Sequence, residues 1–134
     1  MKQFAVIGYP ISHSLGPQLH NEIFKQINLN ASYKTFKILP NNLGEFSLKN
    51  KYDGYNVTIP HKITITKYLN SLDASAKHIS AVNCVHNNIG YNTDWIGFMN
   101  AMEFNNVKLE GRNCLIIGAG GVAYAIAYAL IKSK

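Results

Sequence analysis

Short apolar segments that stop at glycine or proline alternate with segments of helical periodicity along most of the chain. The runs Gln3–Gly8 and Tyr55–Ile59 are each followed within two residues by a proline, which indicates buried strands that end in loops. Between them, Leu19, Ile23 and Ile27 recur every four residues, which is typical of one face of a helix. Such alternation predicts an α/β fold with a mostly parallel sheet flanked by helices in three layers.

The other predicted elements follow from the same patterns. Further strands are predicted at residues 31–39, 81–86 and 113–118, and helices at residues 17–27, 41–49, 73–79, 95–104 and 122–132. A hairpin turn is predicted at residues 87–90 because Asn-Asn-Ile-Gly is rich in turn residues. Residues 61–69 could form either a strand or a helix. The alternation of apolar and polar residues favours a strand, whereas the preceding proline favours the start of a helix.

Composition excludes several classes of protein. The 134 residues carry a formal net charge of +6, but the lysines are dispersed, so we expect neither nucleic-acid nor membrane binding. No apolar run approaches the roughly 20 residues of a membrane span, and the N-terminus does not resemble a signal peptide, so we expect a cytoplasmic protein. Cys84 and Cys114 are interpreted as small buried side chains, and the spacing of the five histidines predicts no metal site.

The sequence Gly118-Ala119-Gly120-Gly121 lies between an apolar run and an alanine-rich segment. Glycines at a strand-to-helix turn let backbone N–H groups approach a phosphate, which then lies at the positive end of the helix. Ala123 completes the variant G-x-G-x-x-A of the dinucleotide fingerprint. The alternative is a simple turn without a ligand.

Two further stretches carry polar groups at places where an α/β sheet binds ligands. Lys62 comes shortly after the strand Tyr55–Ile59, and a lysine partly removed from water there can act as a base. Asp94 precedes a predicted helix and could hold that lysine in place. Residues 12–17, with their hydroxyls ahead of a helix, suit a carboxylate. The alternatives are that Lys62 is an ordinary surface lysine and that Asp94 and residues 12–17 only cap helices.

Five segments occur in the order found in one enzyme family. They are AVIGYPISHSLGPQLHN, YNVTIPHK, SAVNCV, GYNTDWIGF and LIIGAGGVA. On these segments the chain resembles the shikimate dehydrogenase family over essentially its whole length. The resemblance implies reversible, NADP-dependent reduction of 3-dehydroshikimate to shikimate, with these small molecules as partners.

The resemblance also implies roles for individual residues. Lys62 matches the lysine that transfers the proton of the reacting hydroxyl, and Asp94 matches its partner, which also binds the substrate. Thr58 and Asn83 match substrate-binding positions. Ser14 matches the first serine of a Ser-x-Ser motif that binds the substrate carboxylate.

The family pattern further assigns the C-terminal part of the chain. Residues Gly118 to Val122 match the loop that binds the dinucleotide pyrophosphate. Residues 61–69 are expected to be a helix, as in the family. We expect a substrate-binding domain at residues 1–104 and the beginning of an NADP-binding Rossmann domain at residues 105–134.

One departure from the family lies in the carboxylate motif, where Gly16 replaces the second serine. A charge-assisted hydrogen bond of this kind contributes about 1.5–3 kcal/mol, so weaker substrate binding is expected. Restoring serine at this position should lower the Michaelis constant. The same change keeps a quinate/shikimate dehydrogenase of broader specificity as an alternative.

The other departure is length, because family members are about twice this size. The later strands of the cofactor domain, the basic loop that selects NADP over NAD and the residues that close over the substrate are absent, so we expect the 134 residues to be a poor catalyst on their own. The apolar residues 114–117 and 122–131 must then pack on the substrate domain or on a second copy in a homodimer. A non-catalytic, truncated binding module is the alternative outside the enzyme class.

Overall fold

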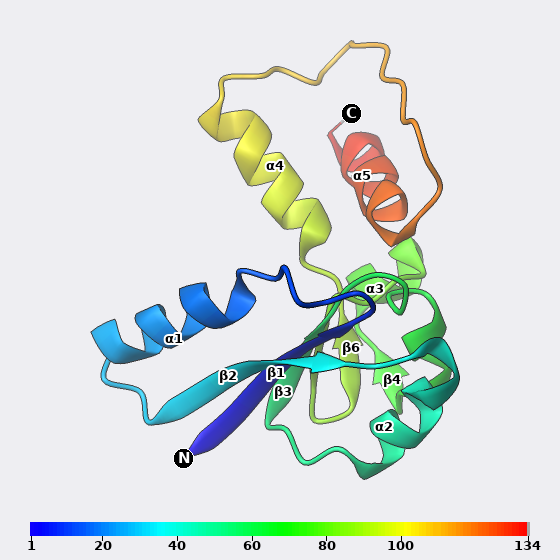
Figure 1. Cartoon of the computed structure of the whole chain (residues 1–134). Coiled ribbons are helices and arrows are strands. Elements are labelled where there is room, and N and C mark those ends of the chain that lie inside the picture. Colours follow the sequence, from blue (N-terminus) through cyan, green and yellow to red (C-terminus); the bar gives the residue numbers. More distant parts are fainter. Residues whose placement is uncertain (134) are drawn as a thin grey trace.

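A computed structural model describes residues 1–133 of the chain (Figure 1). It contains one six-stranded sheet. The strands are β1 (Lys2–Gly8), β2 (Ala31–Lys37), β3 (Gly54–Val57), β4 (Ser71–Leu72), β5 (Cys84–His86) and β6 (Ile89–Tyr91). The helices are α1 (Gly16–Gln26), η1 (Pro40–Asn42), α2 (Leu43–Lys49), η2 (Thr64–Tyr68), α3 (Ala74–Ile79), α4 (Asp94–Phe104) and α5 (Gly121–Lys132), where η marks a 3-10 helix.

The sheet is mixed and mostly parallel, as predicted. Its strand order is β2-β1-β3-β5-β6-β4. β1 pairs in parallel with β2 and β3, and β4 pairs in parallel with β6, whereas β5 is antiparallel to both β3 and β6. Asn87 and Asn88 both have positive φ and form the tight turn of the β5–β6 hairpin, which confirms the predicted turn.

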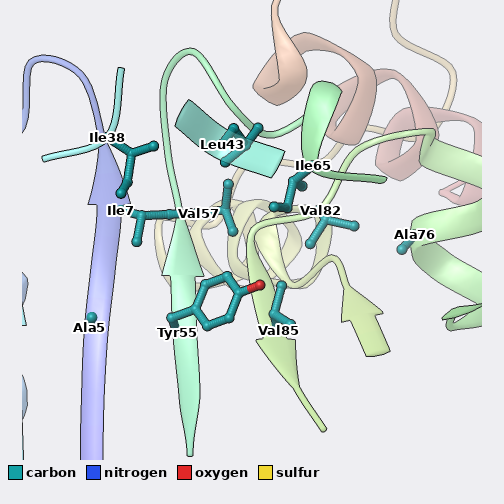
Figure 2. Packing of buried hydrophobic residues seen from close by; sticks show 10 residues of the cluster. All are labelled: Ala5, Ile7, Ile38, Leu43, Tyr55, Val57, Ile65, Ala76, Val82 and Val85. Atoms are coloured by element: carbon teal, nitrogen blue, oxygen red, sulfur yellow. The ribbon is translucent and has the colours of Figure 1, made fainter. Parts of the chain in front are cut away.

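The two faces of the sheet are covered by different helices, because successive strand side chains point to opposite faces. On one face, Phe4 and Val6 of β1 contact Phe24 of α1 and Tyr33 of β2. On the other, α2, η2 and α3 cover the main core (Figure 2). The buried residues of that core are Ala5, Ile7, Ile38, Leu43, Tyr55, Val57, Ile65, Ala76, Val82 and Val85.

Helices α4 and α5 stand at the edge of the sheet, next to each other (Figure 1). Ala125 and Ala129 of α5 are fully buried, and Ala125 packs with Ile79 of α3 and Ala81. A long connection between residues 105 and 120 joins the two helices away from the sheet. The C-terminal helix is thus packed on the rest of the chain, one of the two arrangements expected.

The predicted buried strand at residues 113–118 is wrong. These residues form no strand, and Leu115 and Ile117 are 86% and 92% exposed. A strand is stable only when neighbouring strands satisfy its backbone N–H and C=O groups, and none pairs with this segment within residues 1–133. Cys114 lies in the same segment and is exposed, so its expected burial is also wrong, while Cys84 in β5 is half-buried.

The prediction for residues 61–69 also needs correction. The helix expected over residues 61–69 is limited to the 3-10 helix Thr64–Tyr68, because Thr58 to Ile63 leave the sheet as turns. The face of α1 that carries Leu19, Ile23 and Ile27 is exposed, and Phe24 points to the sheet instead. The four-residue spacing therefore identified the helix but not the side that packs.

Candidate active site

The predicted site residues come from strand ends that meet at one edge of the sheet. β3 and β6 are both antiparallel to β5, so they run in the same direction and end at the same edge. Lys62 follows β3 and Asp94 follows β6, while Asn83 immediately precedes β5, which starts there. Ligands bind at the carboxyl ends of strands in open α/β sheets, so this edge is the expected location of a site.

Lys62 and Asp94 form an ion pair at this edge. The Lys62 Nζ atom donates to Asp94 Oδ2 at 2.6 Å. The two side chains are only 11% and 23% exposed, in contrast to the strongly exposed pairs Lys25–Glu22 and Lys49–Glu45. Because solvent screens a partly buried pair less, this contact fixes the ammonium group more firmly than a surface pair does.

Asn83 binds the same carboxylate from the other side. Its Nδ2 atom donates to Asp94 Oδ1 at 2.8 Å and lies 2.9 Å from Thr93 Oγ1, and its Oδ1 atom accepts the Thr93 N–H at 2.9 Å. The two Asp94 oxygens are therefore divided between Asn83 and Lys62. Three residues predicted from the sequence, Lys62, Asn83 and Asp94, thus form one hydrogen-bonded group.

The backbone around this group is also held in place. Asn92 is 1% exposed, accepts the Asp94 N–H at its Oδ1 atom and donates its Nδ2 group to Ala81 O. The Lys62 carbonyl accepts the Val82 N–H at 2.8 Å. Asp94 is the first residue of α4, where the helix dipole favours a negative charge. The segments that carry Lys62 and Asp94 are thus both hydrogen-bonded to the loop at residues 81–82.

Sequence reasoning did not assign a role to Tyr33 or Asn56, which continue this network. The Tyr33 hydroxyl donates to Asn56 Oδ1 at 2.6 Å, and Asn56 Nδ2 donates to Asn83 O at 3.2 Å. Burial, and to a lesser degree Cys84, raises the pKa of Tyr33, so its hydroxyl stays a neutral donor. The available signal was the alternation in β3, which points Asn56 away from the main core.

Ser14 and Gly16 lie together near Tyr33. The Gly16 N–H donates to Ser14 Oγ at 3.2 Å, and a Cβ atom on Gly16 would lie 3.2 Å from Tyr33 Cε1. Tyr33 therefore connects the predicted carboxylate motif to the Asn56–Asn83–Asp94 chain. Thr58 continues the β1–β3 ladder through its N–H bond to Ile7 O, at the end of β3.

The glycine-rich loop has a conformation that suits a phosphate. Gly118 has φ +118°, which favours glycine, and Gly120 precedes the first turn of α5, where N–H groups lack partners within the helix. A Cβ atom on Gly120 would meet nothing within 4 Å, so a ligand has room beside the backbone. Ala119 is exposed and Val122 is 45% exposed. The start of α5 thus presents exposed N–H groups of the kind that bind phosphate, but the strand that precedes such a loop in a dinucleotide-binding fold is not formed within residues 1–133.

A cleft of ≈ 520 Å³ lies between this loop and the end of β3. Its walls include Ile59, Pro60 and Lys62 on one side and Gly118, Gly120 and Val122 on the other. Lys62 thus contacts Asp94 and also lines the cleft that borders the glycine-rich loop.

Known proteins of similar sequence match almost the whole chain. Residues 6–85 match the family model described as the shikimate dehydrogenase substrate binding domain. The chain is 46% identical over 140 residues to shikimate dehydrogenase (NADP(+)) of Nitrosopumilus maritimus, covering 99% of this chain and 51% of the relative. The chain therefore spans about half the length of the curated relatives it matches.

Solved structures show the same fold. Shikimate dehydrogenase 1 from Peptoclostridium difficile superimposes with a TM-score of 0.92 at 34% identity, covering 99% of this chain and 53% of that one. The Thermus thermophilus shikimate 5-dehydrogenase in complex with NADP(H) and shikimate gives a TM-score of 0.85 at 34% identity, covering 98% and 52%. No described helix is long and apolar enough to cross a membrane.

Proposed function

Since the chain belongs to the shikimate dehydrogenase family, we propose that it provides the substrate-binding half of an NADP-dependent enzyme that interconverts 3-dehydroshikimate and shikimate. The observation that carries this proposal is the partly buried Lys62–Asp94 pair, whose lysine lines the cleft beside the glycine-rich loop. Within this proposal, residues 1–104 bind the substrate and residues 105–134 begin the cofactor domain.

Each polar group has a part in the proposed reaction. During reduction, Lys62 donates a proton to the carbonyl oxygen, and during oxidation its neutral amine removes the hydroxyl proton. Asp94 holds the lysine with one oxygen, while Asn83 fixes the carboxylate through the other. Ser14 binds the substrate carboxylate, and Thr58 contacts the ring. The bound nicotinamide would supply or accept the hydride.

The proposed cofactor site consists of Gly118, Ala119, Gly120, Gly121 and Val122. Their N–H groups at the start of α5 would hold the pyrophosphate. A cytoplasmic location and a small-molecule partner belong to the same proposal. The two cysteines are unpaired in the described structure, which supports a reducing compartment.

Titration calorimetry with shikimate tests substrate binding by the 134-residue chain. We expect binding that is lost or strongly weakened in Lys62→Met and kept in Lys67→Met, which removes an exposed lysine of η2. Quinate, titrated in parallel, distinguishes the broader specificity. Absence of shikimate binding by the folded chain would contradict the proposal.

Catalysis is tested in a chimera that joins this chain to the remaining half of the Nitrosopumilus maritimus relative. We expect 3-dehydroshikimate-dependent oxidation of NADPH, which Lys62→Met abolishes. Shikimate binding without turnover by the folded chimera would support the non-catalytic module instead.

A further inference from the structure

Gly121, the first residue of α5, lies directly against the side chain of Lys62. A Cβ atom on Gly121 would lie 2.8 Å from Lys62 Cβ, 3.2 Å from Cδ and 3.5 Å from Cγ. The first distance is shorter than packed carbon atoms tolerate. The aliphatic part of Lys62 therefore runs along the helix start in the space that a side chain at position 121 would fill.

This close contact cannot be relieved by rotating the lysine. The nearest atom is Lys62 Cβ, which is attached to the backbone, and the Lys62 carbonyl is bound by Val82 N–H. Any larger residue at position 121 must therefore move the Lys62 backbone, the lysine stem or the start of α5. A shift of the Lys62 backbone or stem would pull Nζ away from Asp94 Oδ2, which it meets at 2.6 Å, whereas a shift of α5 would remove the surface on which the stem packs.

The helix that carries Gly121 is itself docked on the helix that carries Asp94. Tyr128 of α5 packs edge-on against Trp95 of α4, with ring centroids 5.3 Å apart. Ala125 and Ala129 on the packed face of α5 are fully buried. The start of α5 is thus held at a defined distance from the ion pair.

We propose that Gly121 is a positioning residue for Lys62. Its missing side chain allows the lysine stem to pack on the first turn of α5 and keeps the ammonium on Asp94. This role rests on the proposed function of Lys62 but is separate from phosphate binding. Gly120, the neighbouring glycine of the same loop, has nothing within 4 Å of its Cβ position and φ −83°, so it lacks the contact.

The test is the reactivity of the Lys62 amine toward acetic anhydride in the 134-residue chain, measured for each lysine by mass spectrometry. We expect Gly121→Ala to raise acetylation of Lys62 about tenfold, since forcing an extra methyl group into a packed site displaces its neighbours. Gly120→Ala should leave this rate unchanged. Acetylation of Lys67, which is exposed, reports any general change in reactivity.

An unchanged Lys62 rate in Gly121→Ala, or an equal rise in Gly120→Ala, would overturn the proposal. Fluorescence of Trp95, the single tryptophan, shows whether α5 stays docked. If Gly121→Ala releases α5, a second variant decides. Ala129→Asp releases α5 while position 121 stays glycine, so equal Lys62 reactivity in both variants counts against the proposal and greater reactivity in Gly121→Ala supports it.

Acetylation of Lys62 does not depend on turnover, so the positioning role of Gly121 and the proposed function can be contradicted independently. Normal NADPH oxidation by a chimera carrying Lys62→Met would remove the proposed function while leaving the packing of Gly121 on Lys62 intact. An unchanged acetylation rate of Lys62 in Gly121→Ala would remove the positioning role while leaving the enzyme assignment intact.

Discussion

Lys62 and Asp94 are 32 residues apart in the chain, yet the lysine Nζ lies 2.6 Å from one carboxylate oxygen. They meet because two strands that run in the same direction end at the same edge of the sheet. The pair is partly buried, and Asn83 occupies the second oxygen. In the proposed reaction, Lys62 exchanges a proton with the substrate oxygen while Asp94 holds the lysine in place.

Removing the charge of Asp94 should destabilise the fold. We expect Asp94→Asn to lower the free energy of unfolding by about 1–3 kcal/mol, because it leaves the partly buried ammonium without its charged partner. Urea denaturation measures this change. Glu45→Gln, which breaks an exposed pair of similar length, is the control and should cause no measurable loss. Equal stabilities of the two variants would show that the Lys62–Asp94 contact is no stronger than a surface pair.

Restoring a hydroxyl at position 16 should tighten shikimate binding. The gain should fall below the ~1.5–3 kcal/mol of an unhindered charge-assisted bond. The reason is that the new Cβ would lie 3.2 Å from both Ser14 Oγ and Tyr33 Cε1, which must shift. Calorimetry on Gly16→Ser measures the change, and Gly16→Ala reproduces the crowding without the hydroxyl. If Gly16→Ser binds no better than Gly16→Ala, the hydroxyl is not what the site lacks.

Stability should fall as the pH drops below 6.5, in part through His20. Burial lowers the pKa of His20, whose ring stacks on Tyr33 at 4.2 Å, below the usual 6.5. The unfolded chain then binds more protons than the folded one, so stability is lost as the pH falls from 6.5 through the folded pKa. Urea midpoints at pH 7.5 and pH 5 measure this. His20→Gln should flatten the profile, and His13→Gln, which removes an exposed histidine, should not.

The connection between α4 and α5 should be the most protease-sensitive part of the chain. An arginine-specific protease has one target, the exposed Arg112, and we expect rapid cleavage there because residues 113–120 form no helix or strand. Glu22→Arg places a second target within α1, which should resist cleavage. Protection of Arg112 that disappears on dilution would indicate instead that Leu115 and Ile117 are covered by a second copy.

Periodicity predicted those elements that local contacts determine. The β1 strand, helices α2 to α5 and the β5–β6 turn were predicted within a few residues, because apolar spacing and the Asn-Asn turn encode them locally. The strand predicted at residues 113–118 failed for the opposite reason. Its apolar sequence is suited to a sheet, but no strand pairs with it within residues 1–133, and pairing is not a property of the segment itself.

The site was predicted unevenly. The motifs identified Lys62, Asn83 and Asp94, which the structure brings together. Tyr33 and Asn56 were missed, since a tyrosine and an asparagine in strands have many ordinary explanations. Their connection to Asn83 depends on β1, β2 and β3 lying side by side, which a strand pattern does not specify.

The sequence by itself determined the fold class, the family and the identity of the paired lysine and aspartate, because motifs and periodicity are local. Only the tertiary structure decided that Gly121 packs against Lys62 and that residues 113–118 stay exposed. It also decided that Tyr33 lies between Gly16 and the hydrogen-bonded chain that leads to Asp94. The physical reason is that these contacts join segments distant in the chain. Their distances depend on how strands pair and helices dock, not on the residues next to them.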